Sequence, residues 1–297
     1  MQHSLSYHWS GFAAAWSVVL IWAMWLIVSR VAGQSGLTIY DLAAFRYGLA
    51  SFIALPIVVY YKAWRGLTFG KVAIISTVLG PLYVLAVFEG FRFAPAAHGG
   101  IFMNGVLPII SIFITYFFFK TRPKRHQLIG AMVILLSVIG LATDQGLVAL
   151  DLRQSWKGDL LFLVGAAFFG LFMSLSRRWN LRLTQVIFCG TLVNCALFVP
   201  VWYVFLPSGI SAAPLWPLII QMVYQGFVPS LIGILLVAHA SNTLGPEQAS
   251  AILAAVPGVG ALFGVLFLHE VLGIQSWISL VFLTMGLLHT TLGKVSR

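Results

Sequence analysis

The chain is poor in charged residues, and above all in acidic ones. Lys and Arg number 17 and Asp and Glu only 7, and together they make up 8% of the 297 residues. A water-soluble domain carries roughly 25% charged residues, so this chain cannot cover a water-facing surface of its size. Hydrophobic residues make up 60%. The composition therefore excludes a soluble globular protein and predicts an integral membrane protein.

Other absences narrow the function. Cys189 and Cys195 are the only cysteines, and they lie in one apolar run on different helix faces, so they indicate nothing about redox compartment or metal. No Walker motif, paired carboxylates or His-x-x-x-His motif is found. These absences argue against ATP-driven transport and against an enzyme, and they indicate no cofactor and no metal. The net charge of +10 is divided among small groups between apolar runs, which favours membrane orientation over nucleic-acid binding.

Long stretches almost free of charge predict an all-α integral membrane protein with ten transmembrane helices, since a helical span needs roughly 20 apolar residues. The predicted spans cover 11–29, 38–61, 72–91, 97–119, 127–143, 158–176, 184–206, 217–241, 247–268 and 272–292. The cluster of Pro, Gly and Ser within 207–217 disfavours a continuous helix and divides the seventh span from the eighth. The first stretch is expected to be a span, not a cleaved signal peptide, because no Lys or Arg precedes it.

Basic residues are unequally divided between the two sides. Most Lys and Arg fall in loops on the side of the amino terminus. Because cytoplasmic loops are the richer in Lys and Arg, both termini are predicted to be cytoplasmic. The expected location is the plasma membrane, which in a bacterium is the inner membrane.

Similar residues recur at a nearly constant offset along the chain. The pairs are Trp9-Ser10-Gly11 with Trp156-Lys157-Gly158, Ser29-Arg30 with Ser176-Arg177, Pro81 with Pro229, and Pro108 with Pro257. They predict two five-span units, 1–143 and 158–297, joined by an extracytoplasmic linker at 144–157. Because five is odd, the second unit must be inserted upside down, and inverted repeats are an architecture of alternating-access transporters. A duplication kept only for packing is the alternative.

Three stretches carry a family resemblance. Arg46-Tyr47, APAAHGGIFMNGVLPII at 94–110 and GPEQASAILAAVPGVGALFGVLFLHEVLG at 245–273 resemble the EamA-like branch of the drug/metabolite transporter superfamily. The resemblance covers nearly the whole chain. It implies an exporter or exchanger of small metabolites such as amino acids, with a cavity lined by spans 1 to 4 and 6 to 9. Spans 5 and 10 would lie outside the cavity and serve assembly, as in a homodimer.

The first half departs from the family's pattern at one place. Lys120 and Thr121 stand where the second half has Glu270. Glu270 and Glu247 lie at predicted helix ends, and a structural role is favoured for both, with a part in a gate as the alternative. Asp41 fits a capping box three residues after Thr38, so helix capping is favoured there.

Arg46 is the strongest candidate for a substrate contact, because an ionisable group inside a span is costly and faces a wet cavity or a partner. It lies roughly 12 Å below the outer end of its span. Its planar guanidinium suits a carboxylate or a phosphate, and a fixed ion pair with Glu89 is an alternative of equal weight. Arg92 is a rival partner for Glu89, three residues along the helix. Glu89 or His98 is the candidate for proton coupling, although structural pairing is favoured for Glu89.

Uncharged polar residues near mid-membrane are weaker candidates, since an amide in hydrocarbon finds its partner in a substrate or in a neighbouring helix. Asn104 ranks first, because the nearby glycines let other backbones approach and Pro108 frees a carbonyl close by. The further candidates for substrate binding are Asn194, Tyr224, Gln225 and Trp22. The prolines predicted to interrupt helices in corresponding places and to act as flexing or gating points are Pro81, Pro108, Pro229 and Pro257.

The sequence therefore favours a secondary exporter of carboxylate-bearing metabolites, amino acids above all. Its expected partners are a small-molecule substrate, membrane lipid and, as candidate coupling ion, a proton. The alternatives are a membrane-embedded enzyme acting on lipid-linked substrates and a non-transporting scaffold.

Overall fold

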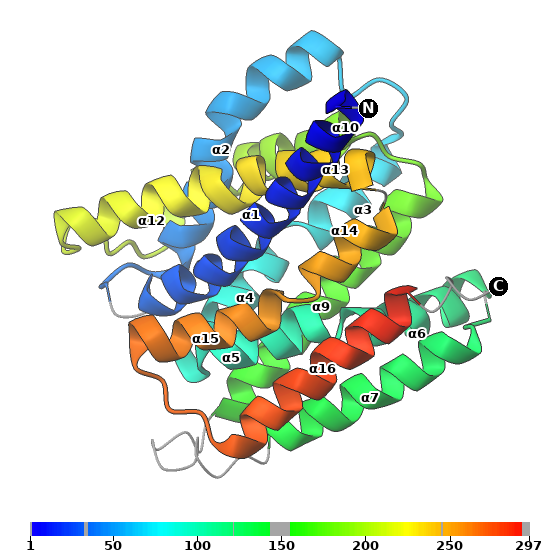
Figure 1. Cartoon of the computed structure of the whole chain (residues 1–297). Coiled ribbons are helices and arrows are strands. Elements are labelled where there is room, and N and C mark those ends of the chain that lie inside the picture. Colours follow the sequence, from blue (N-terminus) through cyan, green and yellow to red (C-terminus); the bar gives the residue numbers. More distant parts are fainter. Residues whose placement is uncertain (1, 33–34, 121, 143–154, 245, 293–297) are drawn as a thin grey trace.

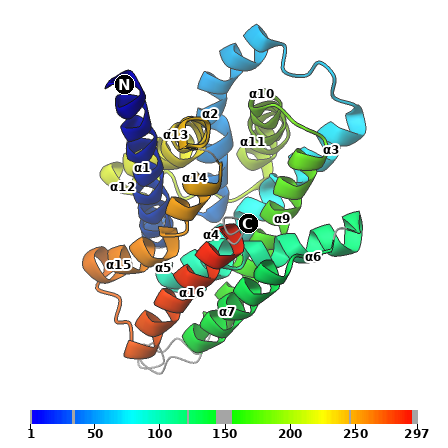
Figure 2. The same cartoon turned by 45° about the vertical axis from the view of Figure 1, so that its right-hand side comes forward.

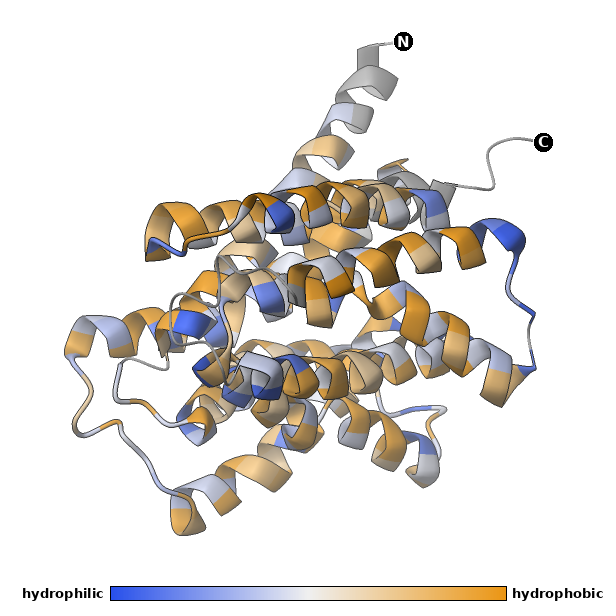
Figure 3. Cartoon of the chain, turned by 90° about the horizontal axis from the view of Figure 1, so that it is seen from below, coloured by the Kyte–Doolittle hydropathy of each residue, from blue (hydrophilic) through white to orange (hydrophobic). Residues whose placement is uncertain are grey.

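The protein is a bundle of helices (Figure 1). The structure, a computed structural model, describes residues 2–32, 35–120, 122–142, 155–244 and 246–292, and no strand occurs in these ranges. Eight helical segments are long and apolar enough to cross a membrane, and two shorter apolar helices, Arg125–Leu141 and Ile274–Thr290, accompany them. Hydrophobic residues cover most of the helices, as Figure 3 shows. The chain is a multi-pass membrane protein.

The first half of the chain contains α1 (Gln2–Ala32), α2 (Ile39–Tyr61), α3 (Phe69–Val78), α4 (Pro81–Phe93), α5 (Ala96–His98), the π-helix η1 (Gly99–Gly105), α6 (Leu107–Phe119) and α7 (Arg125–Ala142). The second half contains α9 (Ser155–Arg178), α10 (Leu183–Ile187), η2 (Phe188–Val193), α11 (Asn194–Phe205), α12 (Leu215–Phe227), η3 (Val228–Ile232), α13 (Gly233–Leu244), α14 (Pro246–Leu253), α15 (Val256–Leu268) and α16 (Ile274–Leu292). The predicted break within 207–217 is confirmed by the gap between α11 and α12.

The four singled-out prolines all lie where a helix loses its regularity. Pro81 begins α4, Pro108 and Pro257 are the second residues of α6 and α15, and Pro229 lies in η3. Proline has no N–H to donate to the preceding turn, and its ring clashes with that turn. The interruptions therefore follow from the local sequence, whereas flexing at these points stays a prediction.

The two halves exchange packing partners. Helix α1 packs against α13, α14 and α15, while α9 packs against α3, α4, η1 and α6 (Figures 1 and 2). The first segment of each half thus lies on the third and fourth segments of the other half. Helix α2 runs beside η2 and α11, and α7 lies beside α16 in both views.

Close backbone contact joins α7 to α16. A Cβ atom on Gly130 would lie 2.8 Å from the carbonyl oxygen of Gly286, and one on Gly286 would lie 3.0 Å from that of Gly130. Lipid tails are as apolar as the side chains, so helices in a membrane associate through such close packing. The two glycines are therefore needed for this crossing.

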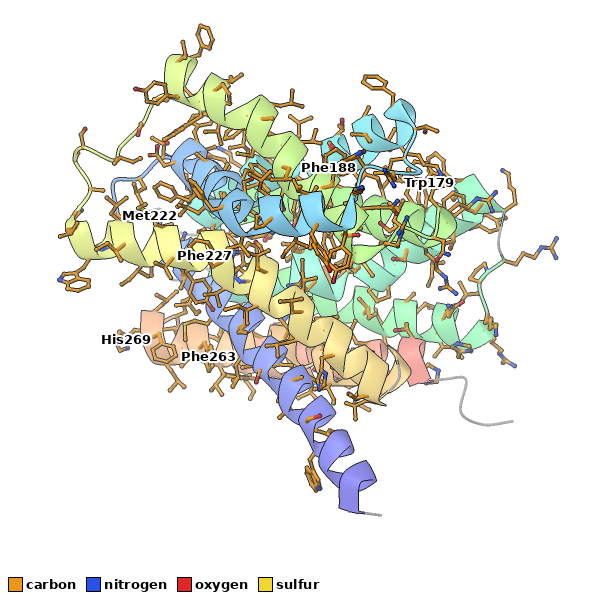
Figure 4. The ribbon with its side chains drawn as sticks, turned by 90° about the horizontal axis from the view of Figure 1, so that it is seen from above. Trp179, Phe188, Met222, Phe227, Phe263 and His269 are labelled. Atoms are coloured by element: carbon orange, nitrogen blue, oxygen red, sulfur yellow. The ribbon has the colours of Figure 1, made fainter. Side chains whose placement is uncertain are left out.

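The main core lies toward one end of the bundle, here called the outer end, where α1 and α15 end and α2 and α9 begin. It includes Trp25, Phe45, Phe91 and Ile101. At the opposite, inner end, α6 exposes four aromatic side chains, Phe113, Tyr116, Phe117 and Phe118, and Phe118 is 69% exposed. Figure 4 shows His269, after α15, and Trp179, after α9, at opposite ends of the molecule.

Candidate functional site

A narrow hollow between α1, α2 and α4 is the candidate substrate site. It is lined by Trp25, Arg46, Tyr83, Val84, Val87 and Phe88, and in this conformation it has no room for even a water molecule. Its walls are aromatic and aliphatic, apart from a guanidinium, a phenol hydroxyl and an indole N–H. Small-molecule pockets usually measure about 300–1,000 Å³, so the helices must move apart before a metabolite fits. The lining suits an organic anion with an apolar body.

Arg46 brings the positive charge into this hollow. Its Cζ lies 5.9 Å from the centre of the Trp25 ring, a cation–π arrangement. Within the described ranges no carboxylate lies at ion-pair distance from Arg46; Glu89 instead pairs with Arg92, with 3.0 Å between Oε1 and Nη1. The Arg46–Glu89 pair is thus not formed, and the rival Glu89–Arg92 pair is. The contact with the ring face uses the charge of the guanidinium and not its N–H groups, so these groups can still donate hydrogen bonds to an anion.

The polar side chains of α12 bind to α1. Gln221 Nε2 donates to the Val28 carbonyl at 2.7 Å, and the Tyr224 hydroxyl donates to the Ile21 carbonyl at 2.9 Å. Hydrogen bonds of this kind join helices where lipid supplies no partner. Tyr224, predicted to bind substrate, is used here for helix contact and does not line the hollow.

Gln225 does not line the hollow, but it contacts Trp25, which does. It is 0% exposed, and its Oε1 accepts a hydrogen bond from Trp25 Nε1 at 2.9 Å. Its Nε2 donates to Ser29 Oγ at 3.2 Å. Gln225 therefore holds the indole ring that faces Arg46, and it acts as a positioning residue in this conformation.

We expect Trp25→Phe to reduce stability, because it leaves the buried Gln225 carbonyl without its donor. The cost of such an unsatisfied group is about 1–3 kcal/mol. Thermal unfolding in detergent measures the change, and Trp16→Phe on the same helix, where the side chain is 49% exposed, is the matched control. Replacing Gln225 by Leu in the Trp25→Phe protein should recover part of the loss. Equal falls in unfolding temperature for Trp25→Phe and Trp16→Phe would contradict the role of Trp25 as the hydrogen-bond donor to Gln225.

The remaining predicted substrate residues also lie outside the hollow lining. Asn194 is buried, and its Nδ2 donates to the carbonyls of Cys189 and Gly190 at 3.3 and 3.2 Å, within its own span. Trp22 Nε1 lies against Gly233 on α13. Asn104 is half-buried in η1, and no side-chain hydrogen bond of Asn104 is found in the part of the chain that the structure describes. Of the predicted set, Arg46 alone lines the hollow.

His98 lies at the outer end, next to the start of η1. It is 2% exposed, and its Nδ1 lies 2.7 Å from Asp159 Oδ1 on α9. Its Nε2 is buried and has no hydrogen-bond partner in the part of the chain that the structure describes. His98 thus joins the first half of the chain to the second through a carboxylate that the sequence analysis did not single out.

Glu270 connects the end of α15 to the start of α5. Its Oε1 accepts a hydrogen bond from the Ala96 N–H at 2.9 Å. Its Oε2 lies over Gly264, where a Cβ atom would come within 2.4 Å, and none of the described residues forms a hydrogen bond with this oxygen. Burial raises the pKa of Glu270 above its usual value, although the Ala96 N–H and the charge of Arg30 oppose the rise.

The raised pKa of Glu270 predicts how stability changes with pH. The folded state holds the proton more tightly than the unfolded chain, so this contribution is full below the unfolded pKa and is lost as pH rises through the folded pKa. We therefore expect Glu270→Gln, which keeps an acceptor for Ala96, to gain thermal stability over wild type as pH rises from 4 to 8. Glu89→Gln is the control and should show no such gain, because it removes an ion pair. The prediction would be contradicted if the thermal stability of wild type rose relative to that of Glu270→Gln as pH increased.

Sequence reasoning missed three residues that shape these sites. Asp159 and Arg30 lie near span ends, where a charge is ordinarily a loop charge, so nothing marked them as buried partners. Tyr83 lies in an apolar span and faces the hollow. Its hydroxyl carried no sequence signal, because aromatic residues are common throughout the chain.

Comparisons with known proteins agree with this architecture. A solved crystal structure matches with a TM-score of 0.64 over 97% of this chain and 99% of its own, at 16% sequence identity, which shows a shared fold. The uncharacterized transporter YyaM of Bacillus subtilis (strain 168) is 22% identical over 231 residues, 73% of each chain. The profile of the EamA-like transporter family matches twice, at residues 9–143 and 156–292. With its helices, its interrupted spans and these two matches, the chain belongs to the EamA-like transporter family.

Proposed function

We propose that this membrane transporter exports small carboxylate-bearing metabolites, amino acids above all. The observation that carries the proposal is Arg46, a cation inside a span that faces the hollow and has no carboxylate partner within the described ranges. A desolvated guanidinium binds a carboxylate through two parallel hydrogen bonds. Apolar walls at Val84, Val87 and Phe88 suit the uncharged part of such a ligand.

The proposed mechanism is alternating access between two inverted five-span repeats, with ten spans in all. The exchanged packing of α1 and α9 supports it. So do two reciprocal contacts between α2 and the seventh span: Asp41 accepts from the Gly209 N–H at 2.9 Å, and Gln185 donates to the Arg65 carbonyl at 3.1 Å. The start of each helix is thus bound to the loop after the other, as expected for antiparallel equivalents.

The proposed orientation places the inner end and both termini in the cytoplasm of a bacterial cell. Helix α1 begins and α16 ends on the same side of the bundle, at the right of Figure 1. The basic residues Lys62, Lys120 and Arg178 lie at this inner end, which agrees with positive loops inside. The paired helices α7 and α16 present exposed apolar residues to lipid or to a second copy in a homodimer.

The test is a comparison of the small metabolites released by cells that carry the protein or an empty vector. We expect a class of carboxylate-bearing compounds to be enriched in the medium only with the protein. Release of uncharged or cationic compounds alone would overturn the substrate class. No difference across a broad panel, in efflux and in uptake, would favour the non-transporting scaffold, and a chemically altered lipid-linked product would favour the enzyme.

A further inference from the structure

Two loops at the inner end are joined by one buried side chain. Gln185, on α10, is 6% exposed. Its Nε2 donates to the Arg65 carbonyl at 3.1 Å, and its Oε1 accepts from the Arg182 N–H at 3.0 Å. Arg65 lies between α2 and α3, and Arg182 lies between α9 and α10, so the contact connects the two halves of the chain. It also brings the backbones of two exposed arginines to the same carboxamide.

A third cation, Lys71 of α3, borders the same contact. Its Nζ lies 5.7 Å from the centre of the Trp179 ring, which precedes Arg182 by three residues. Trp179 packs in one apolar cluster with Leu67 and Leu181, which come from the two joined loops (Figure 4). The cations thus surround a shared apolar base. The residues named the inner basic cluster are Arg65, Lys71 and Arg182.

The positive charge of the inner basic cluster is not balanced by an acid. No ion pair of these three cations is found in the part of the chain that the structure describes, where the pairs are Glu89 with Arg92 and His98 with Asp159 at the outer end. Glu247 lies at the start of α14, which packs against α1, α13 and α16. Like charges that are brought together repel one another, and an anion bound between them removes the repulsion.

A comparable contact at the outer end is made by an acid. Asp41 and Gln185 are the third residues of α2 and α10, and each bonds to a loop of the other half. A glutamate at position 185 would bring a negative charge to Arg65 and Arg182. The neutral amide joins the two loops and leaves both charges uncompensated. The inner basic cluster therefore keeps its full attraction for an anion from outside the chain.

The surroundings of the cluster also require an apolar ligand. The cluster lies where the spans Ile39–Tyr61 and Ser155–Arg178 end and the spans Phe69–Phe93 and Leu183–Phe205 begin. Beside it, the side chain of Trp64 is 44% exposed and that of Phe69 is 89% exposed. Aromatic residues gather where a span meets the lipid headgroups. An anion that carries hydrocarbon next to its charge satisfies both the cations and these rings, whereas a small soluble anion satisfies the cations alone.

We propose that the inner basic cluster binds the phosphate of an anionic phospholipid, with the acyl chains against Phe69 and Trp64. The planar guanidinium groups of Arg65 and Arg182 suit phosphate oxygens through paired N–H donors, and Lys71 adds a point charge. The bound lipid bridges the loop of the first half to the loop of the second half. The proposal depends on neither the substrate nor the direction of transport.

Native mass spectrometry of the purified protein in detergent tests the proposal. Dioleoyl phosphatidylglycerol is compared with dioleoyl phosphatidylcholine, which has the same chains but a headgroup without net charge. We expect wild type to bind phosphatidylglycerol tighter by about tenfold or more, since each Lys or Arg near an anionic lipid surface contributes about fivefold. Arg65→Gln and, independently, Arg182→Gln should each lower the affinity for phosphatidylglycerol by about fivefold and leave that for phosphatidylcholine unchanged.

Lys124→Gln is the matched control. Lys124 is an exposed cation of the inner end, directly before α7 and outside the cluster, and its removal changes the net charge equally. This variant should bind phosphatidylglycerol as wild type does. Equal unfolding temperatures without added lipid identify variants that fold. If an arginine variant unfolds at a lower temperature, Lys71→Gln takes its place, because the Lys71 side chain only contacts a ring face.

Three results would overturn the proposal. Equal affinities of wild type for the two lipids would exclude an anionic-lipid site. Equal losses in Lys124→Gln and in the cluster variants would show a diffuse attraction to the positive end of the molecule. Displacement of phosphatidylglycerol by an equal concentration of glycerol phosphate would show a site for a soluble phosphate and not for a lipid. Each of these results would leave the proposed transport function untouched.

Discussion

Transport by Arg46→Ala is expected to be lower than wild type by about 10-fold to 100-fold, with the protein still folded. Hydrogen bonds to charged groups contribute about 1.5–3 kcal/mol each, and Ala removes every donor that Arg46 offers to a carboxylate. Folding should persist, because Arg46 forms no ion pair in the described part of the chain and is only half-buried. Efflux of the identified metabolite at equal membrane abundance is the measurement.

Two further variants separate charge from geometry at Arg46. Lys keeps the positive charge but loses the planar fork, so Arg46→Lys should restore only part of the activity. Arg92→Ala removes an exposed cation in the last turn of α4, outside the hollow, and should transport almost normally. Full activity in Arg46→Ala would remove Arg46 from the substrate path. Equal losses in Arg46→Ala and Arg92→Ala would indicate a general electrostatic effect and not a binding contact.

Asp41→Ala is expected to have the largest effect on stability. Asp41 is 0% exposed. Its carboxylate accepts hydrogen bonds from the Thr38 N–H at 2.8 Å, from Trp202 Nε1 at 3.0 Å and from the Gly209 N–H at 2.9 Å. Each donor left unsatisfied costs about 1–3 kcal/mol, so the total is about 3 kcal/mol or more. The predicted capping box with Thr38 is confirmed, and the carboxylate also joins α2 to α11 and its following loop.

The expected result is a marked fall in the unfolding temperature and in the yield of monodisperse protein in detergent. Asp41→Asn should lose less than Asp41→Ala, because its one carbonyl oxygen can still accept from the Thr38 and Gly209 N–H groups while its NH₂ group faces Trp202 Nε1. Glu89→Gln, at an ion pair on the helix surface, is the control and should change the temperature little. A protein with Asp41→Asn that unfolds at the wild-type temperature would show that one oxygen acceptor is enough.

Much of the architecture follows from local sequence. The scarcity of charged residues predicts that the chain lies in a membrane. The helix interruptions at Pro81, Pro108, Pro229 and Pro257 follow from the missing N–H of proline. The capping box at Thr38 and Asp41 follows from spacing along one turn. The motifs at 94–110 and 245–273 predicted the family that the profile matches across both halves of the chain. Each of these inferences depends on residues that are neighbours in sequence.

Partners of the polar residues were decided only by the tertiary structure. Trp25 and Gln225 are 200 positions apart, and His98 and Asp159 are 61 apart. Residue type predicted that buried amides and ionisable groups need partners, but a substrate, a helix and a carbonyl satisfy that need equally well. The sequence by itself therefore determined that the chain is a helical membrane transporter with broken spans and a candidate cation at Arg46. Helix packing alone decided that Gln225 meets Trp25, that Arg46 faces a hollow, and that His98 meets Asp159, because hydrogen bonds are short and directional and depend on which helix faces come together.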